Sequence, residues 1–265
     1  MKNKNEKKEE IQFEKPLTIS VVGKGGSGKT AITTLLAKSI STNYNFKMLL
    51  VDADPTHPHL SHMVNLIPDK SLEKLRVNVI EEILTNATNF EKAAENIDFE
   101  VYNAIAENKD FSLFSIGQPE EPGCFCPSNT LLRKVISSIS KDFDIVLIDC
   151  EAGLEQINRM VIETVDILLI VSDISLRSVE TAATISKSAK KFTNYKKMGV
   201  ILNRVKGNID YLVKRLGELN LPLLVKIPED NNIAKFDRQG LPLIDIPKDS
   251  SSLLTVHELL EKIFK

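Results

Sequence analysis

A glycine-rich segment between two apolar stretches constrains this chain more than any other feature. Residues 23–30 read Gly-Lys-Gly-Gly-Ser-Gly-Lys-Thr and fit the pattern G-x-x-x-x-G-K-[ST]. A β-branched run at 17–22 precedes the segment, and residues 31–40 follow it with helical spacing of apolar positions. A strand, a glycine turn and a helix in this order form a phosphate-binding loop, whose backbone N–H groups and helix N-terminus face an anion. The segment therefore predicts a nucleotide-binding α/β fold.

The residue types of this loop fit the chemistry of a bound triphosphate. Gly25, Gly26 and Gly28 let the backbone turn inward without a Cβ in the way. We expect Lys29 to reach the β- and γ-phosphates and the Thr30 hydroxyl to ligate Mg²⁺. The expected nucleotide-binding residues of the loop are Gly23, Lys24, Gly25, Gly26, Ser27, Gly28, Lys29, Thr30 and Ala31.

Apolar runs alternate with amphipathic stretches along most of the chain. Nearly continuous apolar strands are typical of a sheet buried on both faces, and the stretches between them have the spacing of surface helices. The pattern predicts an α/β fold with a doubly wound, mostly parallel sheet of about seven strands and helices on both faces, as in P-loop NTPases. The expected strands are 17–22, 47–52, 111–116, 143–149, 165–173, 197–203 and 221–227, and the expected helices are 31–40, 131–141, 154–163, 178–192 and 209–219.

The 265 residues are expected to form one large domain with a short tail. Residues 1–15 alternate Lys, Glu and Asn without periodicity, which predicts a mobile N-terminal tail. Residues 16–265 are expected to form a single P-loop domain, in which 68–108 contain no long apolar strand and predict a mostly helical insertion. Residues 253–265 are amphipathic with a charge-balanced polar face, which favours packing against the sheet over a membrane anchor.

Composition and charge exclude several classes of protein. Hydrophobic residues make up 42% and charged residues 26%, which excludes a wholly disordered or collagen-like chain. A net charge of −2 argues against non-specific nucleic-acid binding, and the lysine-rich stretch at 187–197 is typical of a solvated helix end. A local patch for nucleic acid or an acidic partner stays open there. Because signal-peptide and membrane-length apolar runs are absent, we expect a cytoplasmic protein without nucleic-acid or membrane partners.

Two of the expected strands end in aspartate-containing sequences. Val-Asp-Ala-Asp-Pro contains Asp52 and Asp54, and Ile-Asp-Cys-Glu-Ala-Gly contains Asp149 and Gly153. Doubly wound sheets bind their ligands at the carboxyl ends of the strands. Phosphoryl transfer needs Mg²⁺ ligation and a positioned water, and carboxylates at this edge suit both tasks.

The loop sequence and these aspartates together resemble the deviant Walker A ATPases of the MinD/ParA/NifH class. The resemblance implies that Lys24 reaches across a face-to-face homodimer to the partner's nucleotide. It implies that Asp54 orients the attacking water, that Asp52 supports the site near the signature lysine, and that Asp149 holds Mg²⁺ through water. It also implies that Gly153 lets the switch backbone move with the γ-phosphate. The expected catalytic residues are Lys24, Lys29, Asp52, Asp54 and Asp149, with Thr30 and Asp149 at the magnesium ion.

The same class flanks its purine with an Asn after one strand and a Pro-Glu or Pro-Asp loop after the next. Asn203 and Arg204 stand at the first position, and Pro228, Glu229 and Asp230 stand at the second. The guanine-reading pattern N/T-K-x-D does not follow at Asn203. The resemblance therefore implies ATP as the nucleotide, with these five residues near its base.

Two cysteines separated by one residue form a candidate metal site. Cys124 and Cys126 lie in a Pro/Gly-rich loop, and two thiolates at this spacing are able to bind one soft metal ion. One chain supplies only two ligands, so a closed four-sulfur site needs a second copy of the chain. A reversible disulfide and two inert thiols are the alternatives. Cys150 follows a strand and is expected to be a buried packing residue rather than a third ligand.

Three segments narrow the resemblance to one family. Gly-Cys-Phe-Cys-Pro-Ser-Asn-Thr-Leu-Leu-Arg, IDCEAGLEQINR and VSDISLRSVETA are similar to the CooC-type nickel-insertion ATPases that mature carbon monoxide dehydrogenase. The similarity covers about residues 17–264. It implies that Cys124 and Cys126 of two subunits hold one Ni²⁺, or Zn²⁺ at the same cysteines, and that ATP closes the dimer and hydrolysis reopens it. It also implies a carbon monoxide dehydrogenase-like client.

The resemblance is weaker after Asp54-Pro55. The family has small polar residues there, whereas this chain has His57, His59 and His62. We interpret these histidines as solvated loop residues, and a nickel relay to the cysteines is the alternative.

Three other functions stay open at this level. A MinD/ParA-like positioning or partition ATPase would bind membrane or DNA. A NifH-like iron–sulfur reductase would hold its cluster between subunits, but its cluster cysteines lie far apart in sequence, unlike this C-x-C pair. A nucleotide-gated binding module without useful turnover is the third.

Overall fold

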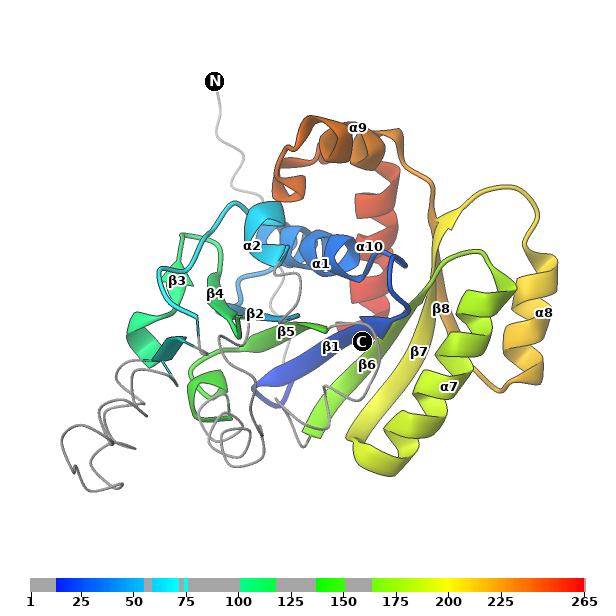
Figure 1. The fold of residues 1–265 in the computed structure, drawn as a ribbon, viewed down its shortest axis with the longest axis horizontal. Helices are drawn as coiled ribbons and strands as arrows, with labels where there is room; N and C mark the ends of the chain where they lie inside the picture. The colour runs from blue at the N-terminus through cyan, green and yellow to red at the C-terminus, as the bar shows by residue number, and fades with distance from the viewer. Residues whose placement is uncertain are drawn as a thin grey trace.

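The computed structural model describes residues 13–54, 59–71, 74–75, 101–117, 137–150 and 164–264. Within these residues the strands form one eight-stranded sheet in the order β3-β4-β2-β5-β1-β6-β7-β8 (Figure 1). Neighbouring strands are parallel, except that β3 pairs antiparallel with β4. The strands are β1 (Leu17–Gly23), β2 (Met48–Ala53), β3 (Ala106–Glu107), β4 (Ser112–Ser115), β5 (Ile145–Cys150), β6 (Thr164–Ser172), β7 (Asn194–Val205) and β8 (Leu223–Pro228). The helices are α1 (Lys29–Asn43), α2 (Leu60–Met63), α7 (Leu176–Phe192), α8 (Asp210–Glu218), α9 (Asn231–Gln239), the 3₁₀ turn η1 (Leu243–Asp245) and α10 (Ser251–Phe264).

The prediction of a doubly wound, mostly parallel α/β sheet is confirmed. The seven apolar runs coincide with β1, β2, β4, β5, β6, β7 and β8. The eighth strand, β3, has only two residues at the edge of the sheet, one of them exposed, and so lacks any apolar periodicity.

Successive side chains of the central strands enter two separate cores. On β2, Leu49 and Val51 belong to the same core cluster as residues of α7 and α8, whereas Met48 and Leu50 belong to the cluster that contains residues of α1 and α10. Helices α1 and α10 therefore cover one face of the sheet, and α7 and α8 cover the other (Figure 1). Burial on both faces explains why these strands are apolar throughout rather than alternating. The expected packing of the C-terminal amphipathic helix on the sheet is confirmed by α10.

The end of the expected N-terminal tail contacts the domain. The Phe13 ring stacks on the Phe264 ring at a centroid distance of 5.9 Å, and Lys15 forms an ion pair of 2.7 Å with Asp144. Residues 1–12 lie outside the described residues, so the mobility expected for them stays a prediction. Most of the expected helical insertion at 68–108 also lies outside the described residues.

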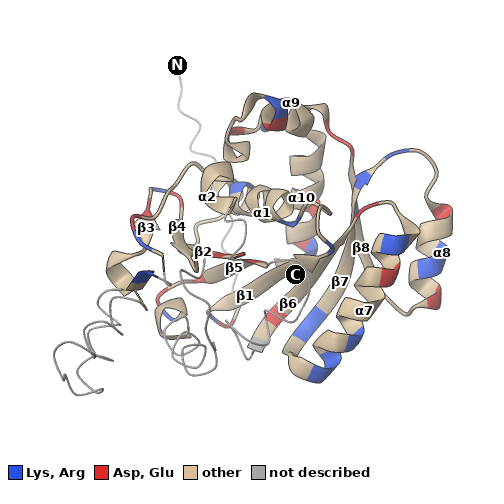
Figure 2. Ribbon diagram, viewed as in Figure 1, with Lys and Arg blue, Asp and Glu red and all other residues tan. Residues whose placement is uncertain are grey.

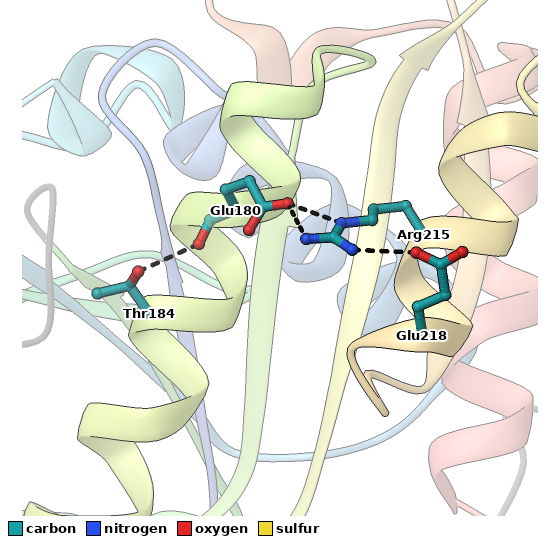
Figure 3. A network of polar contacts seen from close by, with 4 residues as sticks. All are labelled: Glu180, Thr184, Arg215 and Glu218. Atoms are coloured by element: carbon teal, nitrogen blue, oxygen red, sulfur yellow. Dashed lines mark hydrogen bonds and ion pairs between the residues drawn. The ribbon is translucent and has the colours of Figure 1, made fainter.

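An exposed network joins the two helices that flank β7 in the chain (Figure 3). The Arg215 guanidinium on α8 contacts the Glu180 carboxylate on α7 at 2.7 Å, and it also pairs with Glu218 at 3.0 Å. The Thr184 hydroxyl donates to the Glu180 carbonyl at 3.1 Å. Exposed ion pairs stabilise little, so the network mainly specifies how α8 lies against α7.

The lysine-rich stretch at 187–197 lies at the end of α7 and the start of β7 (Figure 2). Lys196 is already paired, with Asp166 at 2.9 Å and with Glu14 at 3.2 Å. The stretch therefore lies at the amino end of β7, whereas the phosphate-binding loop follows the carboxyl end of β1.

Candidate nucleotide site

The phosphate-binding loop joins β1 to α1, as the sequence pattern predicts. Positive φ angles occur at Gly23 (+154°), Gly26 (+76°) and Gly28 (+96°), where Gly28 caps α1. Gly25 is not among the positive-φ residues, and its expected role of leaving room for the backbone without a Cβ stays a prediction. A Cβ on Gly28 would collide with the Asn203 side-chain amide. Glycine is therefore required at position 28 both by backbone conformation and by space.

The two lysines of the loop lie in different environments. Lys29 is the first residue of α1 and is buried, with its ammonium nitrogen 3.5 Å from the Lys24 carbonyl oxygen. Lys24 is half-buried, and among the described residues no hydrogen bond or ion pair engages its ammonium group. Lys29 is therefore turned into the loop, whereas the Lys24 ammonium has no such contact within the described part of the chain.

The carboxylates of two neighbouring strands face each other beside this loop. Asp52 on β2 is in register with Asp149 on β5, and both are buried. Asp149 accepts a hydrogen bond from the Thr33 hydroxyl at 3.2 Å and another from the Thr30 side chain. Hydroxyl and carboxylate oxygens are ligands that Mg²⁺ prefers, so Thr30 and Asp149 fit a magnesium ion, which would neutralise phosphate charge when bound.

The protonation of this carboxylate pair reflects its burial. Burial, and next the charge of Asp149, raise the pKa of Asp52 to about 7. Burial raises the pKa of Asp149 to about 6, against the hydrogen bond from Thr30 and the charge of Lys29. Two buried carboxylates beside one lysine leave an excess of negative charge, which a bound cation would stabilise.

Asp52 has a structural role that the sequence did not reveal. Its carboxylate accepts the backbone N–H of Asp54 at 3.3 Å and the backbone N–H of Leu60 at 3.2 Å. It therefore ties the end of β2 to the start of α2. Asp54 is half-buried at the end of β2, within the electrostatic reach of Asp149. Thr33 was also missed, although it lies one turn after Lys29 on the same helix.

The end of β7 contacts the phosphate-binding loop directly. The Asn203 amide donates to the Ser27 carbonyl at 2.9 Å, and the Arg204 guanidinium donates to the Gly26 carbonyl. The resemblance implies that both residues lie near the purine, which stays a prediction, and it did not indicate these contacts with the loop.

The loop after β8 is held by one buried carboxylate. Asp230 accepts hydrogen bonds from the Ser250 hydroxyl at 2.6 Å, the Ser252 N–H at 3.0 Å and the Asn232 N–H at 2.8 Å. It therefore caps α9 and also holds the start of α10. Glu229 is exposed, donates its N–H to a β7 carbonyl at 3.0 Å and pairs with a lysine at 3.1 Å. The base-contact prediction for Pro228, Glu229 and Asp230 stays a prediction.

We expect Asp230→Asn to destabilise the protein at neutral pH. Burial by itself would raise the pKa of Asp230, but the hydrogen bonds from Ser250, Ser252 and Asn232 outweigh it and lower the pKa to about 2. Because the pKa is lower in the folded state, the contribution is complete above the unfolded pKa and is lost as the pH falls toward 2. Urea unfolding should show a loss of about 1–2 kcal/mol at pH 7 that shrinks between pH 5 and pH 2. Asp237→Asn, an exposed change on α9, is the control, and an equal loss at all pH values would contradict the assignment.

Several predicted site residues lie outside the described residues: Gly153, Cys124, Cys126 and His57. His59 precedes α2 and His62 lies within it. Cys150 is buried in the core, and burial raises the pKa of its thiol, as expected for a packing residue. Within the described ranges, no group of three or more His, Cys, Asp or Glu side chains could hold a metal ion. In the same ranges, no helix combines the length and hydropathy needed to cross a bilayer.

Comparison with known protein families shows which family this chain belongs to. The sequence profile of the AAA domain family matches residues 17–201, well over half of the chain. The chain belongs to the AAA domain family. This AAA-domain protein is accordingly a P-loop ATPase, with ATP as its nucleotide.

Individual relatives of the AAA-domain protein cover almost its whole length. An uncharacterised ATP-binding protein of Methanocaldococcus jannaschii is 34% identical over 93% of this chain and 98% of its own. The carbon monoxide dehydrogenase accessory protein CooC of Rhodospirillum rubrum is 28% identical over 87% of this chain and 90% of its own. The septum site-determining protein MinD of Pyrococcus horikoshii, solved in complex with Mg-ADP, has a TM-score of 0.67 at 22% identity, covering 93% of this chain and 95% of its own. The AAA-domain protein therefore has the MinD/ParA fold.

Proposed function

We propose that the AAA-domain ATPase is a nucleotide-gated homodimer that inserts nickel into an enzyme of the carbon monoxide dehydrogenase kind. The observation that carries the proposal is the Cys124-Phe125-Cys126 sequence in a chain that is 28% identical to a carbon monoxide dehydrogenase accessory protein. Nickel is the cargo, bound by two thiolates from each subunit. Zn²⁺ is the alternative ion at the same cysteines.

The environment of Lys24 supports the homodimer. Lys29 is already turned into its own loop, whereas the Lys24 ammonium has no hydrogen-bond or ion-pair partner among the described residues. A partner's triphosphate would provide the negative charge that this ammonium lacks. A two-fold axis would also bring four cysteine sulfurs together from two chains.

ATP would drive nickel transfer by changing the population of closed dimers. Moving a two-state equilibrium from 1:99 to 99:1 requires a preference of about 5.5 kcal/mol for one state. Charge-assisted hydrogen bonds contribute about 1.5–3 kcal/mol each, so a few contacts to the γ-phosphate suffice. The roles proposed for the aspartates are water positioning by Asp54 and magnesium ligation by Asp149. Asp52 would support both by holding the end of β2.

A MinD/ParA-like positioning ATPase is the second candidate. It is favoured by the structural likeness to the Pyrococcus horikoshii MinD, with a TM-score of 0.67. This function predicts sedimentation of the protein with vesicles or DNA only when ATP is present. It predicts no effect of Cys124 or Cys126 on that behaviour.

Metal content under anaerobic conditions tests the first candidate. Nickel and zinc are measured per dimer, with and without a non-hydrolysable ATP analogue, together with the oligomeric state by light scattering. We expect one metal ion per dimer, altered by nucleotide and lost in Cys124→Ser/Cys126→Ser. Cys150→Ala is the matched control because its thiol is buried in the core. Metal-free protein in every state would overturn the nickel proposal and favour the vesicle and DNA assays.

A further inference from the structure

The carboxyl end of β7 donates two hydrogen bonds to successive carbonyls of the phosphate-binding loop. The buried Asn203 amide donates to the Ser27 carbonyl at 2.9 Å, and the Arg204 guanidinium donates to the Gly26 carbonyl. The Asn203 amide lies so close to Gly28 that any Cβ there would collide with it. These contacts link the loop to a strand about 176 positions away in the sequence.

The backbone at Arg204 is shaped to make this contact. Its φ of +56° lies in the left-handed region, which residues other than glycine rarely adopt. The Asn203 side-chain oxygen accepts the Arg204 N–H at 2.9 Å and so stabilises this turn. Asn203 therefore holds the loop with its amide nitrogen and holds the Arg204 backbone with its amide oxygen.

The hydrogen bonds determine which way the loop's peptide groups face. In a planar trans peptide the C=O and the N–H point in opposite directions. Holding the Ser27 carbonyl toward Asn203 therefore turns the Gly28 N–H away from Asn203. Holding the Gly26 carbonyl turns the Ser27 N–H toward the Lys24 carbonyl, to which it donates at 3.2 Å. The two contacts thus stabilise the tight turn and orient the N–H of Gly28, the residue that caps α1.

We infer that Asn203 and Arg204 are positioning residues for the phosphate-binding loop and act on the nucleotide through its phosphates. This role is separate from the contact with the purine that the resemblance implies. The inference depends on the chain being an ATPase, and it is independent of the proposed nickel function. Neither residue needs to touch a phosphate, because each acts by holding a loop carbonyl.

A ligand without a base separates the two roles. Mg-tripolyphosphate carries the phosphates of ATP but has no purine, and its dissociation constant is measured beside that of Mg-ATP. The variants are Asn203→Ala and Arg204→Ala, which remove the donors without adding charge. The matched control is Arg238→Ala, which also removes an exposed guanidinium that donates to a backbone carbonyl, but within α9.

In both variants we expect the dissociation constants of Mg-tripolyphosphate and Mg-ATP to rise by a similar factor of about five to ten. This is the loss of affinity expected for one or two lost hydrogen bonds. KM for ATP should rise by a similar factor while kcat changes by less than about twofold, because the bound triphosphate then orders the same groups. Arg238→Ala should change none of these dissociation constants and kinetic constants.

Undiminished tripolyphosphate binding in both variants would overturn the inference, whether or not ATP binding falls. Thermal melting without nucleotide checks that the variants fold. If the buried Asn203→Ala does not fold, the exposed Arg204→Ala decides the question alone.

Discussion

Lys29→Ala should abolish ATP binding at millimolar concentrations, with a loss of affinity of at least about a hundredfold. The Lys29 ammonium is buried at the start of α1 and directed at the loop. Each charge-assisted hydrogen bond to a phosphate contributes about 1.5–3 kcal/mol, and two such bonds correspond to a hundredfold or more. Titration with a fluorescent ATP analogue and steady-state turnover measure the loss.

Lys38→Ala is the matched control for this variant, because it removes a lysine from the same helix α1. It should bind and hydrolyse ATP as the unmodified protein does. If Lys29→Ala bound ATP within about threefold of the unmodified protein, the assignment of the phosphate site to this loop would be wrong.

Asp54→Ala should lower ATP turnover by about 10²–10³-fold while Mg-ATP binding stays within about threefold. Asp54 directly follows β2 beside the buried carboxylates, and its backbone N–H donates to the Asp52 carboxylate. Its proposed role is to orient the attacking water, a contribution made in the transition state and not in the bound ground state. Turnover is measured with a phosphate-release assay at saturating ATP, and binding is measured separately.

Asp69→Ala, an exposed change outside the site, is the control for Asp54→Ala. Turnover that is unchanged in Asp54→Ala would remove the water-positioning role. It would then favour a nucleotide-gated module in which ATP binding alone changes the state of the protein.

The contacts of Asp52, on β2, show why it should be tested separately from Asp54, which follows the strand. Asp54 is half-buried at the end of the strand, whereas Asp52 is buried and hydrogen-bonded to the backbone on both sides of residues 55–58. Changing Asp52 would therefore disturb the backbone around Asp54 as well as the charge beside Asp149. The Asp54 variant is the clearer test of chemistry.

The sequence alone determined the sheet and the phosphate-binding loop. Seven strands were predictable because burial on both faces makes each an uninterrupted apolar run, a property of residues that are neighbours in the chain. The loop was predictable because Gly26, Gly28, Lys29 and Thr30 fulfil their conformational and chemical requirements within one short segment. The position of Asp149 near the loop followed from the rule that parallel strands end at the same edge.

Only the tertiary structure decided the elements that lack a local signal. Helix α9 has no fully buried residue and rests on the core only through the partly buried Ile233 and Phe236, too few apolar positions to predict a helix, and its N-terminus depends on capping by Asp230. The same carboxylate holds serines about twenty positions later, a contact that no spacing rule contains. The contacts of Asn203 and Arg204 with the loop join segments that are far apart in sequence and neighbours only because β7 folds into the same sheet as β1. Local pattern thus specified which segments form the site, and the packing of distant segments decided which side chains hold it in shape.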